Sequence, residues 1–128
     1  MKKSIEHYLE IIRQLVTGLY KVEVEGYQEQ VLTRDRVNLR IRLRFVNNSL
    51  LEISEAIRIV DSNFTWLSYR YHYQRPDGSV IFRYDNTPHH PDVKTHPDHK
   101  HIGESVIESQ RPDIEKILSE VKEHLCDI

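Results

Sequence analysis

Five of the eight histidines of this 128-residue chain fall within 13 consecutive positions, from His89 to His101. We call this stretch, HHPDVKTHPDHKH, the histidine segment. Histidine is the side chain whose unperturbed pKa lies nearest to neutrality, so such a dense group suits proton transfer, metal ligation or contact with phosphate. A solvated, histidine-rich loop without chemistry is the alternative. The predicted catalytic groups, including one carboxylate to orient an imidazole, are His89, His90, His96, His99, His101 and Asp85.

A segment rich in tyrosine and arginine precedes the histidine segment and is predicted to form a hairpin over residues 64–85. Aromatic rings beside arginines offer flat faces for bases and guanidinium groups for phosphates, as in the recognition of unpaired RNA or DNA. Strand alternation places the tyrosines on one face and Arg70 and His72 on the other. The alternative is that the tyrosines belong to the core, with their hydroxyl groups at its rim. The hairpin residues predicted to contact nucleic acid are Arg70, Tyr71, His72, Tyr73 and Arg83.

Arginines also alternate with apolar side chains between residues 36 and 45, which is the clearest strand pattern in the chain. We predict that Arg40 and Arg42 contact phosphates from this strand. Glutamates on the neighbouring strands, at positions 23, 25 and 52, favour an alternative in which the arginines form cross-strand ion pairs.

These side chains are compatible with two kinds of phosphodiester chemistry. In the first, one histidine or tyrosine deprotonates a ribose 2′-hydroxyl, a second protonates the leaving oxygen, and arginines stabilise the phosphate charge. In the second, a divalent metal binds to the histidine segment, which has enough imidazoles and carboxylates for zinc. The histidine spacings of six, three and two match no familiar structural zinc pattern, and no cysteine takes part. We therefore predict no cofactor, with a metal as the alternative.

Length and composition predict one domain over residues 1–128. The net charge of -2 confines any nucleic-acid surface to a local patch. The single cysteine, Cys126, excludes an internal disulfide, and charged residues interrupt the N-terminal segment where a secretory signal requires an apolar run. Since no apolar run is long enough for a membrane span, we expect a cytoplasmic protein without membrane contact.

The pattern of elements predicts an α+β fold. Apolar residues recur at helical spacing after Ser4 until Gly18, and again after Pro112. Between the two helices, five strands are predicted to form an antiparallel meander, with a bulge or a doubly buried face near residues 54–57. We expect the terminal helices to pack together on one face of this sheet, leaving the other open for a partner or substrate.

Turn residues also predict the register of the hairpin. Pro76-Asp77-Gly78 suits a type I turn followed by a left-handed glycine bulge. With that bulge, Tyr71 faces Arg83 and His72 faces Phe82, whereas a slip of one residue exchanges these partners.

Four linked motifs carry a family resemblance. They are Tyr71-His72-Tyr73-Gln74 with Pro76-Asp77-Gly78, Phe82-Arg83-Tyr84-Asp85-Asn86, Pro88-His89-His90-Pro91 and His99-Lys100-His101-Ile102-Gly103. With these motifs the chain resembles the TumE family of toxin components of bacterial and archaeal toxin–antitoxin pairs. The resemblance implies a small toxin whose partner is a helix-turn-helix antitoxin encoded beside it, and it transfers no catalytic residue.

The leading hypothesis is a toxin that acts on RNA as a metal-independent endoribonuclease, using the hairpin and the histidine segment. One alternative is a non-catalytic module that binds nucleic acid or protein and inhibits by occupancy. Another is a metal-dependent nuclease or hydrolase. An exposed sheet edge also makes a homodimer an expected assembly, although an antitoxin segment that covers the active surface is a competing use of the fold.

Overall fold

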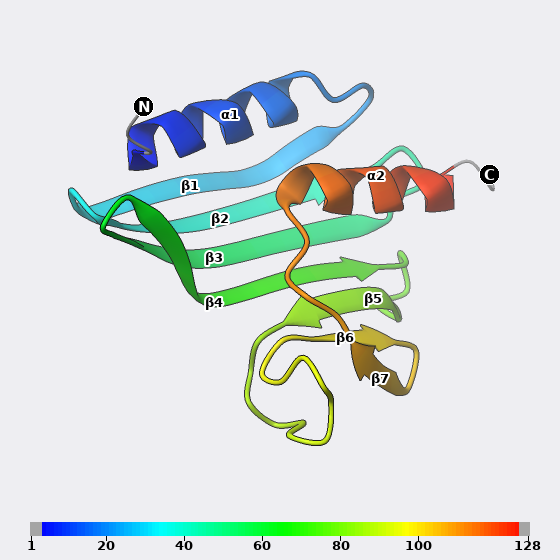
Figure 1. Ribbon diagram of the computed structural model, residues 1–128. Helices are drawn as coiled ribbons and strands as arrows, with labels where there is room; N and C mark the ends of the chain where they lie inside the picture. Colours follow the sequence, from blue (N-terminus) through cyan, green and yellow to red (C-terminus); the bar gives the residue numbers. More distant parts are fainter. Residues whose placement is uncertain (1–3, 126–128) are drawn as a thin grey trace.

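The structure, a computed structural model, describes residues 4–125, so Cys126 lies outside the described residues. Within this range, two helices flank seven strands, and the strands form one antiparallel sheet in the order of the sequence (Figure 1). The elements are α1 (Ile5–Thr17), β1 (Glu23–Thr33), β2 (Arg36–Arg44), β3 (Leu50–Val60), β4 (Asn63–Gln74), β5 (Val80–Asp85), β6 (His99–Ile102), β7 (Ser105–Glu108) and α2 (Ile114–Leu125). None of the helices in the described range is long and apolar enough to cross a lipid bilayer.

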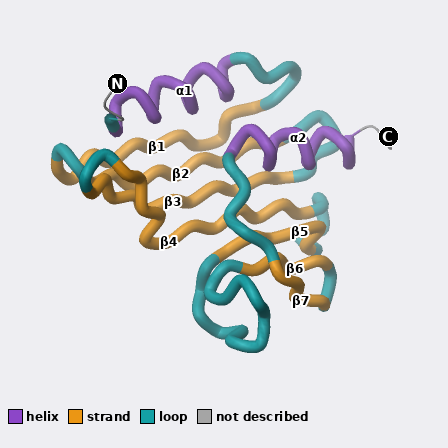
Figure 2. The backbone as a smooth tube through the Cα atoms, in the orientation of Figure 1, coloured by secondary structure: helices purple, strands orange, loops and turns teal. Residues whose placement is uncertain are grey.

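Helices begin and end the described chain, as predicted (Figure 2). The hydroxyl of Ser4 accepts a hydrogen bond from the backbone N–H of His7 and so caps α1. Asp113 caps α2 in the same way by accepting from the backbone N–H of Lys116. The buried stripes of both helices join one core with the inward-facing residues of β2, β3, β4 and β5. The opposite face of the sheet therefore carries no helix among the described residues.

The prediction of five strands is wrong, because the sheet has seven. The two additional strands are β6, which carries His99 and His101, and β7, which follows after a tight turn. Gly103 in that turn has a φ of 57°, a left-handed conformation that glycine adopts at little cost. Four residues per strand provide too little periodicity for a prediction from alternation alone. The end of the histidine segment is consequently part of the sheet rather than of a loop.

The predicted register of the hairpin is also wrong by one residue. His72 lies opposite Arg83, and Tyr71 lies opposite Tyr84. Gly78 has the expected left-handed φ of 90°, but a further register shift lies between Tyr73 and Gln74. Because this irregularity adds a residue on the side of β5, the partners beyond it move by one position.

A register shift lies beside Ala56 and Ile57 in the pairing of β3 with β4, but its additional residue is Leu67 on β4, so the bulge predicted at residues 54–57 is not in β3. Alternation in β3 continues through this region without a change of face, with Ile53, Glu55 and Ile57 all buried. The polar character of Glu55, and not a change of phase, interrupts the apolar pattern there.

Glu55 is a buried carboxylate in the core, with only 2% of its surface exposed. It accepts hydrogen bonds from the hydroxyl of Tyr8 at 2.6 Å, from the indole N–H of Trp66 at 3.0 Å and from the hydroxyl of Tyr71. The guanidinium of Arg111 lies 3.8 Å away and stacks over the ring of Trp66. Burial raises the pKa of Glu55, and these donors act against that rise. The carboxylate thereby links α1, β3, β4 and the segment before α2.

Candidate functional site

The helix-free face of the sheet aligns two rows of polar side chains across five strands. The first row is Arg40, Ser54, Arg70, Asp85 and His99, and the second is Arg42, Glu52, His72, Arg83 and His101. These positions alternate with core residues such as Ile41, Ile53 and Tyr71. Neighbouring strands lie about 4.8 Å apart, so each row crosses the sheet in short steps. The sheet register therefore joins the predicted phosphate contacts to the predicted proton-transfer groups on one surface.

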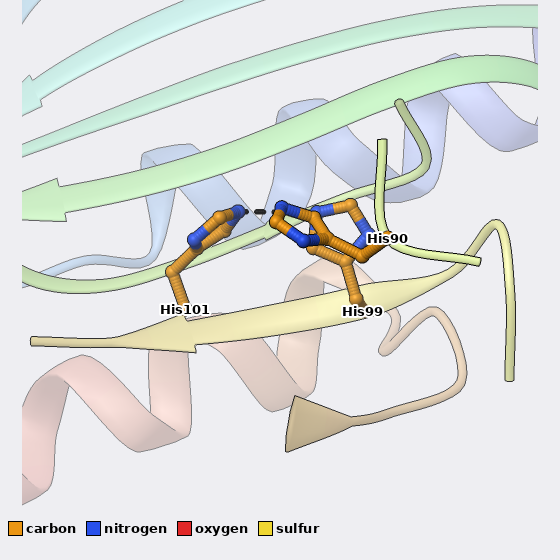
Figure 3. A group of neighbouring side chains, drawn as sticks. All are labelled: His90, His99 and His101. Atoms are coloured by element: carbon orange, nitrogen blue, oxygen red, sulfur yellow. Dashed lines mark hydrogen bonds between the residues drawn. The ribbon is translucent and has the colours of Figure 1, made fainter. Parts of the chain in front are cut away.

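Three imidazoles meet at the β6 end of these rows, and we call His90, His99 and His101 the histidine cluster. His99 and His101 lie on β6, and His90 reaches them from the connection after β5 (Figure 3). The Nε2 atoms of His99 and His101 are 3.1 Å apart. The ring centroid of His90 lies 4.9 Å from that of His99 and 5.5 Å from that of His101. Each of the three offers a ring nitrogen within 4.8 Å of the others.

Asp85 and the backbone hold His99 in one orientation. Nδ1 of His99 lies 2.8 Å from the carbonyl oxygen of Pro97, which can only accept, so Nδ1 is the donor. Nε2 of His99 then faces Oδ1 of Asp85 at 2.9 Å. His99 and Asp85 are 2% and 4% exposed, respectively, so this pair forms the buried floor of the cluster.

Positive charge and burial both lower the pKa of imidazoles on this face. Nε of Arg83 lies 3.1 Å from Oδ2 of Asp85, and about a third of the Arg83 side chain remains exposed. Burial lowers the pKa of His101, and the charge of Arg83 acts in the same direction. Burial also lowers the pKa of His72, whose Nε2 contacts the side-chain oxygen of Gln74 at 3.0 Å. Both effects favour the neutral imidazole in these two residues.

A depression of about 370 Å³ lies on the same face over β1 to β4, and β5 separates it from the β6 histidines of the cluster. Arg40, Arg42 and Arg70 line it, and the small residues Gly26 and Ser54 leave space between them. Arg42 forms ion pairs with Glu25 at 2.9 Å and with Glu52 at 3.3 Å, as the alternative of cross-strand pairing predicts. Among the described residues, Arg40 and Arg70 form no ion pair within 4.0 Å.

Two tyrosines predicted to stack on bases do not lie on this surface. Tyr71 and Tyr73 face the core and are completely buried, and their hydroxyl groups contact Glu55 and Ser49. Period-two alternation separates them from Arg70 and His72, and the helices cover the face on which the tyrosines lie. The alternative of core tyrosines is therefore correct for the rings, but the hydroxyl groups of both residues are buried and do not lie at the rim of the core. Neither ring offers a face to a ligand.

The histidine segment itself is divided by the fold. His90, His99 and His101 converge, whereas His89 and His96 are exposed and lie outside the cluster. Among the described residues, His90, His99 and His101 are the only group of three or more His, Cys, Asp or Glu side chains whose ligand atoms all lie within 4.8 Å of one another.

Comparison with protein families identifies the family of this chain. The sequence model of the family described as Toxin TumE matches residues 9–125, from within α1 to the end of α2. The chain belongs to the TumE toxin family. Searches of the curated proteins and of the solved structures gave no match. Membership in a toxin family implies an antitoxin as the partner of this toxin.

The sequence motifs of the toxin contained one signal for the site that the strand prediction overlooked. Residues 99–102 and 105–108 are two short runs separated by two residues, the first of which is Gly103. A two-residue separation with glycine is typical of a β-hairpin. This spacing indicates that His99 and His101, two residues apart on a strand, point to the same face.

Proposed function

We propose that this toxin cleaves RNA at the histidine cluster. One observation supports the proposal above all: on a single sheet face the cross-strand register joins Arg40 at one end, Arg70 in the middle, and His99 and His101 at the other end. Phosphate-binding cations beside a group of imidazoles are the parts that RNA transesterification requires. The outward direction of these side chains favours a substrate that lies across the strands.

The proposed reaction is an attack within the RNA chain. One imidazole accepts the proton of a ribose 2′-hydroxyl as its oxygen bonds to the adjacent phosphorus. The bond from phosphorus to the 5′ oxygen breaks, and a second imidazole donates its proton to that oxygen. The products are a 2′,3′-cyclic phosphate and a 5′-hydroxyl.

The partly exposed His90 and His101 suit the two proton transfers, because a substrate can reach both. Buried His99 and Asp85 act as positioning residues, since they contact His101 and not the solvent. The exposed part of the Arg83 guanidinium is available to the phosphate oxygens, whose negative charge increases during the attack.

Mapping of RNA ends tests this function. The toxin is expressed with and without its antitoxin, and purified toxin is incubated with RNA. New ends that carry a cyclic phosphate and a 5′-hydroxyl are expected only where free toxin is present. Growth inhibition without new RNA ends would instead support a module that inhibits by occupancy.

Substitution of Arg40 and Arg70 by alanine is expected to weaken RNA binding at all sequences. Each lost phosphate contact should reduce the slope of log affinity against log salt by about 0.7 for a single strand. Fluorescence anisotropy with a labelled RNA at several salt concentrations measures both effects. Lys116, exposed on α2 over the other face, provides the matched control, and Lys116→Ala should leave affinity and slope unchanged. Equal losses in the control would contradict binding at the helix-free face.

We also propose that a helix-turn-helix antitoxin neutralises the toxin by covering the helix-free face. An antitoxin bound there blocks substrate access to the arginines and to the histidine cluster together, because both lie on that face.

A homodimer through the edge strand β1 is a further proposal. β1 is eleven residues long, and Val24, Val31 and Leu32 on it are exposed. A long, exposed edge with apolar side chains favours pairing with a second strand. Size-exclusion chromatography with light scattering should therefore show a dimer at micromolar concentration. A monomer under these conditions would be incompatible with the proposal.

A further inference from the structure

The donor atoms of the histidine cluster have the separations of a metal-binding site. Nε2 of His99 lies 2.9 Å from Oδ1 of Asp85 and 3.1 Å from Nε2 of His101, and Oδ2 of Asp85 lies 3.6 Å from the latter atom. Ligands bound tetrahedrally to zinc at about 2.0–2.1 Å lie about 3.3 Å from one another. The separation of the two imidazole nitrogens is close to this value. A ring nitrogen of His90 lies within 4.8 Å of the other two imidazole ligand atoms and completes the set.

We propose that His90, His99 and His101 bind one divalent transition-metal ion of the zinc class beside the carboxylate of Asp85. The proposal rests on the geometry of the cluster and does not depend on the proposed function. It departs from the expectation of no cofactor, which used the spacing of histidines along the chain. The fold instead takes its donors from the connection after β5 and from β6.

The position of protons in the cluster supports a cation at its centre. Because Nδ1 of His99 donates to the carbonyl of Pro97, a neutral His99 carries a lone pair on Nε2. That atom faces both a carboxylate oxygen and a second imidazole nitrogen. A proton on Nε2 of His99 can point toward only one of these two neighbours. A metal ion, in contrast, attracts the His99 nitrogen, the carboxylate oxygen and the second imidazole nitrogen at the same time. A backbone carbonyl on the remote ring nitrogen is also the usual outer partner of a metal-binding histidine.

The chemistry of the donors selects the class of metal. Imidazole nitrogens suit Zn²⁺, Cu²⁺, Ni²⁺ and Fe²⁺, while Mg²⁺ and Ca²⁺ prefer sites built from oxygen. Arg83 approaches Oδ2 of Asp85 and leaves Oδ1 directed at His99. His99 and Asp85 provide a buried, fixed half of the site, and the partly exposed His90 and His101 provide the route of entry.

Zinc titration of the intact protein tests the site. After dialysis against a chelator, the full chain should take up one equivalent of Zn²⁺ in calorimetry and in competition with a coloured zinc indicator. His99→Ala and His101→Ala should bind at least about 100-fold more weakly, since loss of even an outer partner costs 10–100-fold. His89→Ala and His96→Ala are matched controls from the same segment, and both should bind Zn²⁺ as the natural chain does. No binding, or equal losses in the controls, would overturn the site.

A second measurement uses the unaltered chain, so its result does not depend on whether the variants fold. Nitrogen-15 spectra of the imidazoles should show zinc-induced shifts for His90, His99 and His101 and none for His89 and His96. Shifts confined to the latter pair would assign the metal to the exposed loop and contradict the proposal.

RNA cleavage with and without Zn²⁺ separates the metal site from the proposed function. Metal at the cluster occupies the lone pairs that proton transfer uses, so saturation should inhibit cleavage. A protein that binds one Zn²⁺ and cleaves RNA only when loaded would retain the site and overturn the metal-independent reaction. A protein that binds Zn²⁺ and cleaves nothing would retain the site and overturn the proposed function.

Discussion

Replacement of His101 by alanine is expected to reduce RNA cleavage by about 10²–10⁴-fold, the usual contribution of a general acid or base. The imidazole of His101 lies 3.1 Å from Nε2 of His99 and is partly exposed, so it is both held in place and accessible to a ribose hydroxyl. Cleavage rates of purified protein on a labelled RNA measure the effect. Growth inhibition during expression without antitoxin should disappear in parallel.

The matched control for this prediction is His96→Ala. His96 belongs to the same histidine segment, but it is exposed and lies outside the cluster. Its removal should leave cleavage and growth inhibition unchanged, and thermal unfolding should show that both variants are folded. A folded His101→Ala protein that cleaves at the natural rate would refute the role of the cluster. If that variant inhibits growth without producing RNA ends, inhibition arises from occupancy.

Replacement of Glu55 by alanine is expected to destabilise the fold by about 3–5 kcal/mol, the cost of removing one partner from a buried charged group. Two phenol hydroxyls and one indole N–H lose their acceptor, and Arg111 loses its nearby carboxylate. Buried donors without a partner incur their full desolvation cost. Thermal and urea unfolding should show a fall in melting temperature of about 10 °C or more.

Glu52 provides the comparison for Glu55, since both lie on β3 but face opposite sides of the sheet. The side chain of Glu52 is 38% exposed and pairs with Arg42, so Glu52→Ala should cost at most about 1 kcal/mol. Glu55→Gln keeps one acceptor oxygen, so the stability of this variant should lie between the stabilities of the two alanine variants. Equal stability of the Glu52→Ala and Glu55→Ala proteins would show that the buried carboxylate is not a structural centre.

Much of the framework follows from patterns between neighbours along the chain. The apolar stripes and the cap at Ser4 predict the helices, and alternation from residue 36 to 45 predicts β2. Gly78 marks its turn because few other residues adopt a left-handed conformation easily. The separation of Arg70 from Tyr71 follows from alternation, and linked motifs identify the family. Local backbone preference and side-chain periodicity suffice for each of these features.

Other features depend on contacts between segments that are distant in sequence. Alternation separates the tyrosines from the arginines, but only the packing of both helices decides that Tyr71 and Tyr73 are buried. The hairpin register depends on an irregularity beside Tyr73 that no turn residue predicts. The division of the histidine segment is of the same kind, since His90 meets His99 only because the connection after β5 folds back toward β6. Residue types thus indicate which chemistry is available. Packing across the sheet selects which side chains from different segments meet, because the distances between those segments depend on long-range contacts.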